Sequence, residues 1–142
     1  MGQQQLILVI LVTVLVGIAS IVAINTFGQS AEISNREAVR QDLLYGVNMA
    51  QTVYYRSSLL GGAGRDFTSY QGNILDLMGL PMSQNASGEW QNENGTYDIE
   101  DLGKDSFTIR GRPATGGADI LALVELDEEN RIWVVSINDD EE

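Results

Sequence analysis

The residues of this chain with the greatest capacity for chemistry are its carboxylates, since 20 of its 142 residues are Asp or Glu. Two clusters of carboxylates stand out, one made of Asp98, Glu100, Asp101 and Asp105 and the other of Asp127, Glu128 and Glu129. Carboxylate oxygens bind Ca²⁺, and paired carboxylates can serve as general acid and base. Neither spacing fits an EF-hand loop. A solvated acidic turn is therefore the simpler interpretation of both clusters.

Other catalytic side chains are scarce. The sequence contains no Cys and no His, which excludes disulfides, thiol chemistry and an imidazole base. The glycine-rich run Gly61–Asp66 (GGAGRD) lacks the GK[ST] ending of a phosphate-binding loop, and it follows a predicted helix instead of opening one. We therefore expect no enzyme, no cofactor and no metal. Asn85 and Asn94 each begin an Asn-X-Ser/Thr triplet and are possible N-glycosylation sites.

The charge of the chain limits its partners. Its formal net charge is -12, and Lys104 is the only lysine among eight cations. Nucleic acid is not an expected partner, because phosphate binding requires clustered cations. Anionic lipid headgroups would be repelled for the same reason. An acidic, lysine-poor surface suits either high salt or an exported domain.

The most prominent segment is the apolar run from Leu6 to Ile24 (LILVILVTVLVGIASIVAI). It contains 19 residues, and no charged residue precedes Glu32. A run of this length can cross a bilayer as a helix, and residues 1–30 are the expected transmembrane or filament-core segment. A signal peptide would carry a cationic start and a shorter apolar core. The residues expected to pack in a helix bundle are Leu6, Ile7, Val9, Ile10, Val14, Gly17, Ile21 and Ile24.

An amphipathic pattern continues the helix over residues 31–60. Its apolar positions recur at three- and four-residue steps, at Val39, Leu43, Val47, Ala50 and Tyr54. Glu32 and Arg36 are four apart, and Glu37 and Arg40 three apart, so both pairs can form on one helix face. We expect the helix to end near Leu60, before the glycines from Gly61 on, and to bend or melt near Gly17 or Gly28.

Strand patterns dominate the end of the chain. Residues 61–94 are expected to form a connecting loop with a short helical piece around 74–82. Four strands are predicted at 96–99, 106–112, 119–126 and 131–137, with an acidic tail over 138–142. Short turns between them indicate an antiparallel sheet covering 95–137, and the amphipathic half of the long helix is its expected cover. The predicted fold class is α+β, with residues 31–142 forming one globular head.

This architecture resembles the type IV pilin and pseudopilin family. Members of that family have a leader that ends in Gly, an apolar run directly after it, a long helix and an antiparallel sheet. The resemblance implies prepilin-peptidase cleavage between Gly2 and Gln3. Position 7 is Ile7, where the family has a glutamate five residues after the cut, and the family's helix-bending proline is missing. In the family, charges pair between neighbouring subunits. The side-chain amides of residues 3–5 (QQQ) are candidates to form hydrogen bonds between neighbours in place of that pairing.

The resemblance also implies a function. The chain would be a subunit of an extracellular surface filament, a homopolymer held by its apolar helices. Its precursor would wait in the cytoplasmic membrane until an assembly platform and an ATPase extract it. Two alternatives remain at the level of sequence: a pseudopilin of a secretion machine, and a bitopic membrane protein with a small β-rich binding or sensing domain. A bitopic anchor usually carries Lys or Arg on its cytoplasmic side, and none occurs before Arg36.

Overall fold

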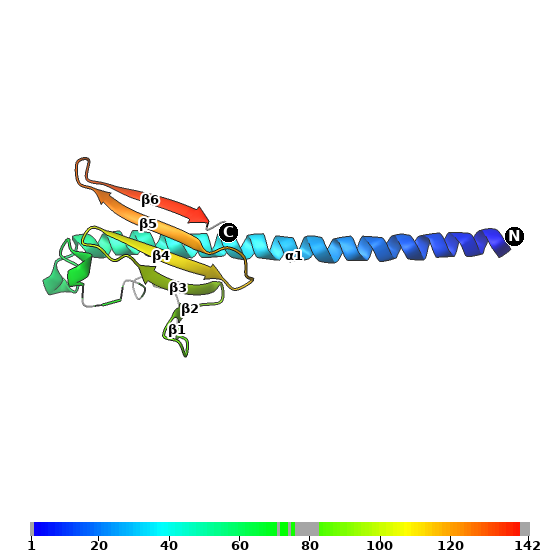
Figure 1. The fold of residues 1–142 in the computed structure, drawn as a ribbon, viewed down its shortest axis with the longest axis horizontal. Helices are drawn as coiled ribbons and strands as arrows, with labels where there is room; N and C mark the ends of the chain where they lie inside the picture. Colours follow the sequence, from blue (N-terminus) through cyan, green and yellow to red (C-terminus); the bar gives the residue numbers. More distant parts are fainter. Residues whose placement is uncertain (1, 71, 74, 76–82, 140–142) are drawn as a thin grey trace. The chain divides into compact units, whose positions relative to one another are not determined.

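The computed structural model describes residues 2–70, 72–73, 75 and 83–139. It contains one long helix, α1 (Gly2–Tyr55), followed by an antiparallel sheet (Figure 1). The chain divides into two compact units, Met1–Ser34 and Asn35–Glu142. The fold class is α+β, as the sequence predicts.

The sheet has six strands in the order β1-β2-β3-β4-β5-β6, each antiparallel to its sequence neighbour. The last four are long and regular: β3 (Gly95–Glu100), β4 (Ser106–Pro113), β5 (Ile120–Asp127) and β6 (Ile132–Asp139). They coincide closely with the four predicted strands, because alternating apolar residues and short turns mark them in the sequence.

The expectation of four strands is wrong by two. The additional strands, β1 (Ser83–Gln84) and β2 (Trp90–Gln91), lie within the segment 61–94 that the sequence predicts to be a loop. Each has only two residues, which is too short to show an alternating pattern. The Asn85 side chain organises the turn between them by accepting hydrogen bonds from the backbone N–H groups of Ser87 and Glu89, at 2.9 and 3.0 Å. The predicted helical piece at 74–82 lies largely outside the described residues.

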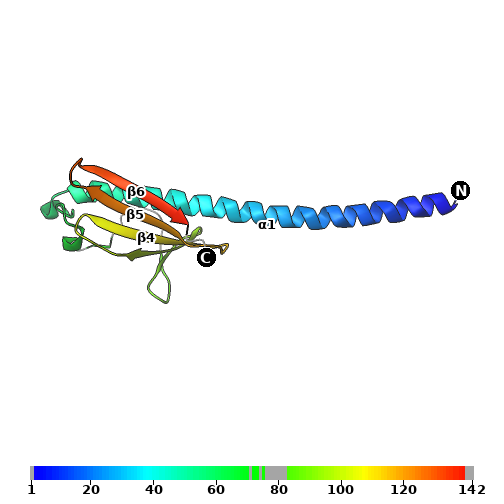
Figure 2. The same ribbon diagram turned by 45° about the horizontal axis from the view of Figure 1, so that its top comes forward.

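The core of the second unit lies between the sheet and the last third of α1 (Figure 2). The predicted helix positions Val39, Leu43, Val47, Ala50 and Tyr54 are all buried. They meet inward-facing side chains of the four long strands, which alternate with outward-facing ones as a half-buried sheet requires. The fully buried members are Tyr97, Phe107, Ile109, Ile120, Ala122 and Val124.

A glycine in the sheet sets how closely the helix approaches. Gly111 lies on β4 opposite α1, and a Cβ atom there would lie 2.7 Å from a methyl group of Val39 and 3.4 Å from one of Leu43. The first distance is shorter than real Cβ contacts permit. Gly111 therefore allows the helix to pack directly on the strand backbone.

The helix ends at Tyr55, five residues before the predicted end at Leu60. Residues 58–60 form a separate 3-10 helix, η1 (Ser58–Leu60). The N–H groups of Ala63, Gly64 and Arg65 bond the carbonyls of Val53, Arg56 and Tyr54, respectively. The glycine-rich run thus folds back and satisfies the last carbonyls of the helix. A second 3-10 helix, η2 (Phe67–Ser69), follows.

Candidate assembly site on the apolar helix

The first unit consists of one helix whose apolar side chains have no partner in the chain. From Leu6 to Ile24, every large apolar side chain is between 50% and 71% exposed. Successive residues of a helix point 100° apart, so these exposed side chains cover all sides of the cylinder. A helix that is apolar all round belongs in a dry environment, either a membrane or a packed bundle.

The two polar side chains between Leu6 and Ile24, Thr13 and Ser20, are satisfied by the helix itself, as is Thr26 just beyond this stretch. The hydroxyl groups of Thr13, Ser20 and Thr26 donate to the carbonyls of Ile10, Val16 and Val22, at 2.8, 2.8 and 2.9 Å. Each hydroxyl thereby loses its need for water. The segment can consequently enter an apolar environment without leaving a side-chain donor unsatisfied.

The predicted packing residues all lie on this exposed helix. Leu6, Ile7, Val9, Ile10, Val14, Ile21 and Ile24 are exposed, and a Cβ atom at Gly17 would meet nothing within 4 Å. The surface beside Gly17 is open for close approach by another helix. The helix runs without interruption through Gly17 and Gly28, so it does not melt at either glycine, and of the two expected outcomes only a bend stays a prediction.

The proposed cleavage position lies in the first turn. Gly2 is the first residue of α1, and Gln3, Gln4 and Gln5 are exposed. None of the three amides bonds another side chain of the described residues, so all three are available to a neighbouring molecule. Ile7 is 65% exposed, which places an apolar side chain where the resembling family has its glutamate.

The length and apolar composition of α1 are sufficient for a membrane span. Length and apolar composition by themselves do not establish a membrane span, because signal sequences and the buried helices of soluble proteins also have them. What distinguishes this helix is that its most apolar stretch is entirely unburied within the chain. Its environment must therefore come from lipid or from other molecules.

A buried aspartate, which the sequence analysis missed, joins the last part of α1 to the sheet. One carboxylate oxygen of Asp42 accepts hydrogen bonds from Asn92 Nδ2, Asn94 Nδ2 and the Tyr97 hydroxyl, at 2.8, 2.8 and 2.6 Å. Burial and the bond to Asp42 raise the pKa of Tyr97. The signal in the sequence is a charged residue on the apolar stripe between Val39 and Leu43, but its partners lie about 50 residues away.

A second polar junction fixes the end of β6 to the helix. Asp139 forms ion pairs with Arg36 and Arg40, at 2.8 and 2.5 Å. Burial alone would raise the pKa of Asp139, but the hydrogen bonds from Arg40 and Arg36 outweigh it and lower that pKa. The predicted pair Glu37–Arg40 is present. The predicted pair Glu32–Arg36 is absent among the described residues, because Arg36 turns to Asp139 and to the Ala118 carbonyl instead.

The two possible glycosylation residues both take part in turn structure. Asn94 lies between β2 and β3, where its side-chain nitrogen donates to Asp42 and its carbonyl accepts from Asn35, at 2.9 Å. Asn85 lies between β1 and β2, and its side-chain nitrogen donates to Glu89, also at 2.9 Å. Both asparagine side chains are partly buried. A sugar at either position would have to accommodate these bonds.

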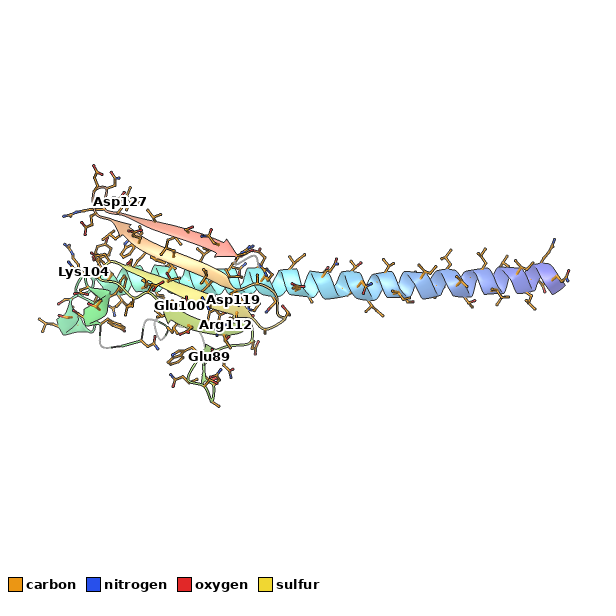
Figure 3. The ribbon with its side chains drawn as sticks, in the orientation of Figure 1. Glu89, Glu100, Lys104, Arg112, Asp119 and Asp127 are labelled. Atoms are coloured by element: carbon orange, nitrogen blue, oxygen red, sulfur yellow. The ribbon has the colours of Figure 1, made fainter. Side chains whose placement is uncertain are left out.

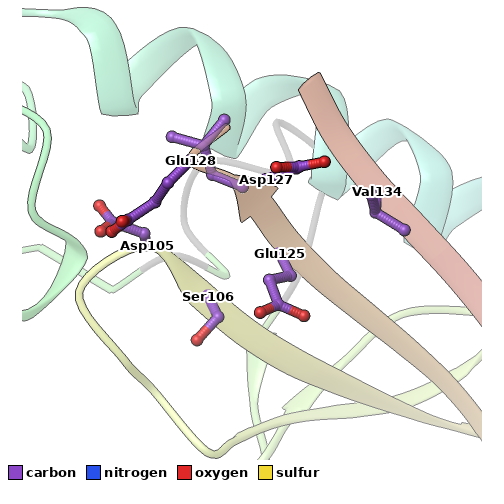
Figure 4. A pocket seen from close by; sticks show the side chains of 7 residues that line it. Asp105, Ser106, Glu125, Asp127, Glu128 and Val134 are labelled. Atoms are coloured by element: carbon purple, nitrogen blue, oxygen red, sulfur yellow. The ribbon is translucent and has the colours of Figure 1, made fainter. Parts of the chain in front are cut away.

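The acidic clusters resolve into turns and ion pairs. Asp105, Asp127 and Glu128 line a pocket together with Ser106, Glu125, Leu126 and Val134 (Figure 4). Asp127 accepts hydrogen bonds from the backbone of Glu129 and Asn130, and these bonds, with that of the Asn130 side chain, lower its pKa. In the parts of the chain that the structure describes, no three Asp or Glu residues gather as ligands for a metal ion.

Comparisons of the chain with protein-family models, with curated proteins and with solved structures return no match. The functional interpretation consequently rests on the residues and on their geometry.

Proposed function

We propose that this chain is a structural subunit of a type IV pilus-like extracellular filament. The observation that carries the proposal is the exposure, on all sides, of the apolar side chains from Leu6 to Ile24. The second unit has a closed core of its own. The first unit, which has no core of its own, therefore requires other molecules to cover it.

Polymerisation supplies that cover. In the proposed filament the helices of many copies form a central bundle, and each large apolar side chain removed from water contributes about 1.5–3 kcal/mol. No side chain before Glu32 is charged, so moving the segment from lipid into a bundle leaves no buried side-chain charge unpaired. Thr13, Ser20 and Thr26 need no external partner in either environment.

The route to the filament follows from the family resemblance. The precursor is inserted in the cytoplasmic membrane, prepilin peptidase cuts between Gly2 and Gln3, and an assembly platform with its ATPase moves the subunit into the growing polymer. The exposed amides of Gln3, Gln4 and Gln5 then bond between neighbouring subunits. Enzymatic activity, a cofactor and nucleic-acid binding are not part of this proposal.

The second candidate is a permanent membrane anchor that carries a small β-rich domain. It is favoured by the sufficient length and apolar composition of α1. It gives no reason, however, for the lack of Lys and Arg ahead of Arg36, since anchors usually carry cations on the cytoplasmic side. A pseudopilin of a secretion machine would share the same helix and head.

Shearing separates these candidates. Cells that make the chain are sheared, and the released material is examined by electron microscopy and by mass spectrometry of the subunit's N-terminus. The filament proposal predicts filaments that contain this chain and begin at Gln3. Recovery of the chain only as detergent-extracted monomers from membranes would favour the anchor. A variant with Ala at positions 3–5 tests the amides separately, because unchanged assembly would remove their proposed role.

A further inference from the structure

A basic pocket lies at one end of the sheet, in the second unit. Three cations line it, Arg65, Lys104 and Arg131, and we call it the basic pocket. Its volume is about 340 Å³, and its other lining residues are Tyr54, Tyr55, Asp105, Leu126 and Glu128. Three cations against the two carboxylates Asp105 and Glu128 give the lining a formal charge of +1 in a chain of net charge -12, and a locally positive site favours an anion.

These three cations are not consumed by ion pairs. Four other arginines pair with carboxylates: Arg36 and Arg40 with Asp139, and Arg110 and Arg112 with Glu100 and Glu89, on the outer face of the sheet (Figure 3). Arg65, Lys104 and Arg131, by contrast, form no ion pair with any residue that the structure describes. Their side chains are exposed and can receive a carboxylate from outside.

The backbone holds the three cations in place around the pocket. Arg65 donates its N–H to the Tyr54 carbonyl at 2.8 Å, and the Lys104 carbonyl accepts from Phe67 at 2.9 Å. Arg131 occupies the left-handed region at φ 54° in the turn between β5 and β6. The Asp105 carboxylate, which also lines the pocket, is engaged by the Tyr54 hydroxyl. The fold of the subunit itself therefore sets the backbone positions of the three cations around the pocket.

The sequence provides one segment suited to this pocket. Residues 139–142 read DDEE, and Arg36 and Arg40 fix the first of these, Asp139, at the end of β6. Arg131, in the pocket, directly precedes the start of β6. Figure 3 accordingly places Lys104 and the tip of the β6 arrow at opposite ends of the sheet.

A single copy cannot join these two features. Strand β6 covers eight residues, which corresponds to roughly 23 Å between its ends at about 3.3 Å per residue. The three residues after Asp139 reach at most about 10 Å. Residues 140–142 of one copy therefore fall short of the basic pocket of the same copy.

We propose that the basic pocket of one subunit binds the carboxylates of residues 140–142 of the next subunit. The inference rests on the proposed function, because it describes the contact between neighbouring heads. Two different patches at opposite ends of the head meet, so the contact is heterologous, and a heterologous contact that does not close a ring propagates into an open polymer. Arginine binds carboxylates through paired hydrogen bonds. The contact therefore offsets the repulsion between acidic heads where they meet.

Carbodiimide cross-linking of native filaments tests this contact. The reagent joins an amine to a carboxylate at contact distance, and Lys104 carries the only lysine amine of the chain. We expect a ladder of dimers, trimers and longer species, with mass spectrometry locating the bond between Lys104 and a residue of 140–142. Lys104→Arg is the matched control, because it keeps the charge and removes the amine. Filaments of this variant should show no such ladder.

The outcomes separate this inference from the proposed function. Filaments without a bond between Lys104 and residues 140–142, or with Lys104 joined only to carboxylates of its own subunit, overturn the inference and leave the filament intact. A failure to find filaments at all defeats the proposed function instead. Protection of Lys104 by an added polyanion, without subunit cross-links, would assign the pocket to a different anionic ligand and also overturn the inference.

Reversing the charges provides a second readout. Arg131→Glu should reduce the yield of sheared filaments several-fold, and combining it with Asp140→Arg and Glu141→Arg should restore the yield, since the attraction is then re-formed with opposite signs. If the combined variant yields no more filaments than Arg131→Glu alone, the pairing is wrong. Circular dichroism of each variant shows whether the head is folded.

Discussion

The two parts of α1 differ in what they require from their surroundings. Between Gly2 and Ser34 no described residue is buried, whereas between Asn35 and Tyr55 eight are buried. The first part is apolar on all sides and the second on one side only. A helix with one apolar stripe is completed by its own sheet. A helix that is apolar all round can be completed only by lipid or by other chains, so the first part depends on its surroundings and the second part on the chain's own sheet.

The strongest test of this difference is a charge in the apolar part. Val14→Asp places a carboxylate in the middle of the run from Leu6 to Ile24, where a charge costs about 2.5–3.5 kcal/mol on insertion scales. We expect the sheared filament fraction to be lost while the head remains folded. Electron microscopy and the near-ultraviolet circular dichroism of the chain in detergent measure the two effects. Val14→Leu is the control and should assemble normally.

The converse change damages the head and spares the apolar part. Leu43 is fully buried between α1 and β4, and Leu43→Ala should lower the free energy of unfolding of the head by about 2–5 kcal/mol. Both tryptophans, Trp90 and Trp133, lie in the head, so their fluorescence during urea unfolding reports on it. Leu44→Ala, at a position 43% exposed, should cost much less. Equal effects of the two substitutions would contradict the assignment of the helix faces.

A smaller effect is expected at the buried aspartate. Asp42→Asn replaces a charged acceptor of three hydrogen bonds by a neutral amide, which should lower the free energy of unfolding by about 1–3 kcal/mol. Asp101→Asn is the control, because Asp101 is exposed, and asparagine tolerates its positive φ of 51°. Similar stabilities of the Asp42→Asn and control variants would show that the Asp42 network does not hold the helix on the sheet.

The smallest effect concerns pH. Because the pKa of Asp139 is lowered in the folded state, its ion pairs contribute stability above the ordinary aspartate pKa of 3.8, and this contribution is lost as the pH falls through the lowered value. Asp139→Asn should therefore lower stability at pH 7 by about 1 kcal/mol or less. The difference from the parent should disappear in strong acid. A difference that persists at low pH would mean that packing, and not charge, stabilises this junction.

Much of the head could be predicted from the sequence. Regular spacing identified the buried positions from Val39 to Tyr54, and alternation identified the four long strands. The two short strands escaped prediction because two residues form no pattern. The helix end at Tyr55 also escaped, because its cause is the return of residues 63–65 onto the last carbonyls.

The apolar helical stretch from Leu6 to Ile24 could be identified from the sequence, since composition alone defines it, and its packing against other copies stays a prediction. The polar junctions could not be identified, because each joins residues that are distant in sequence: Asp42 with Tyr97, and Arg36 with Asp139. Local spacing suggested Glu32 for Arg36, but tertiary structure provided a different partner. The basic pocket likewise brings together three cations from three separate loops.

The most direct test of the central claim is a density map of the filaments sheared from cells. We predict a central bundle in which residues 6–24 of each subunit contact the same segment of other subunits, with the β-sheets outside. The contradicting result is a chain whose residues 6–24 are surrounded only by lipid and never by copies of themselves.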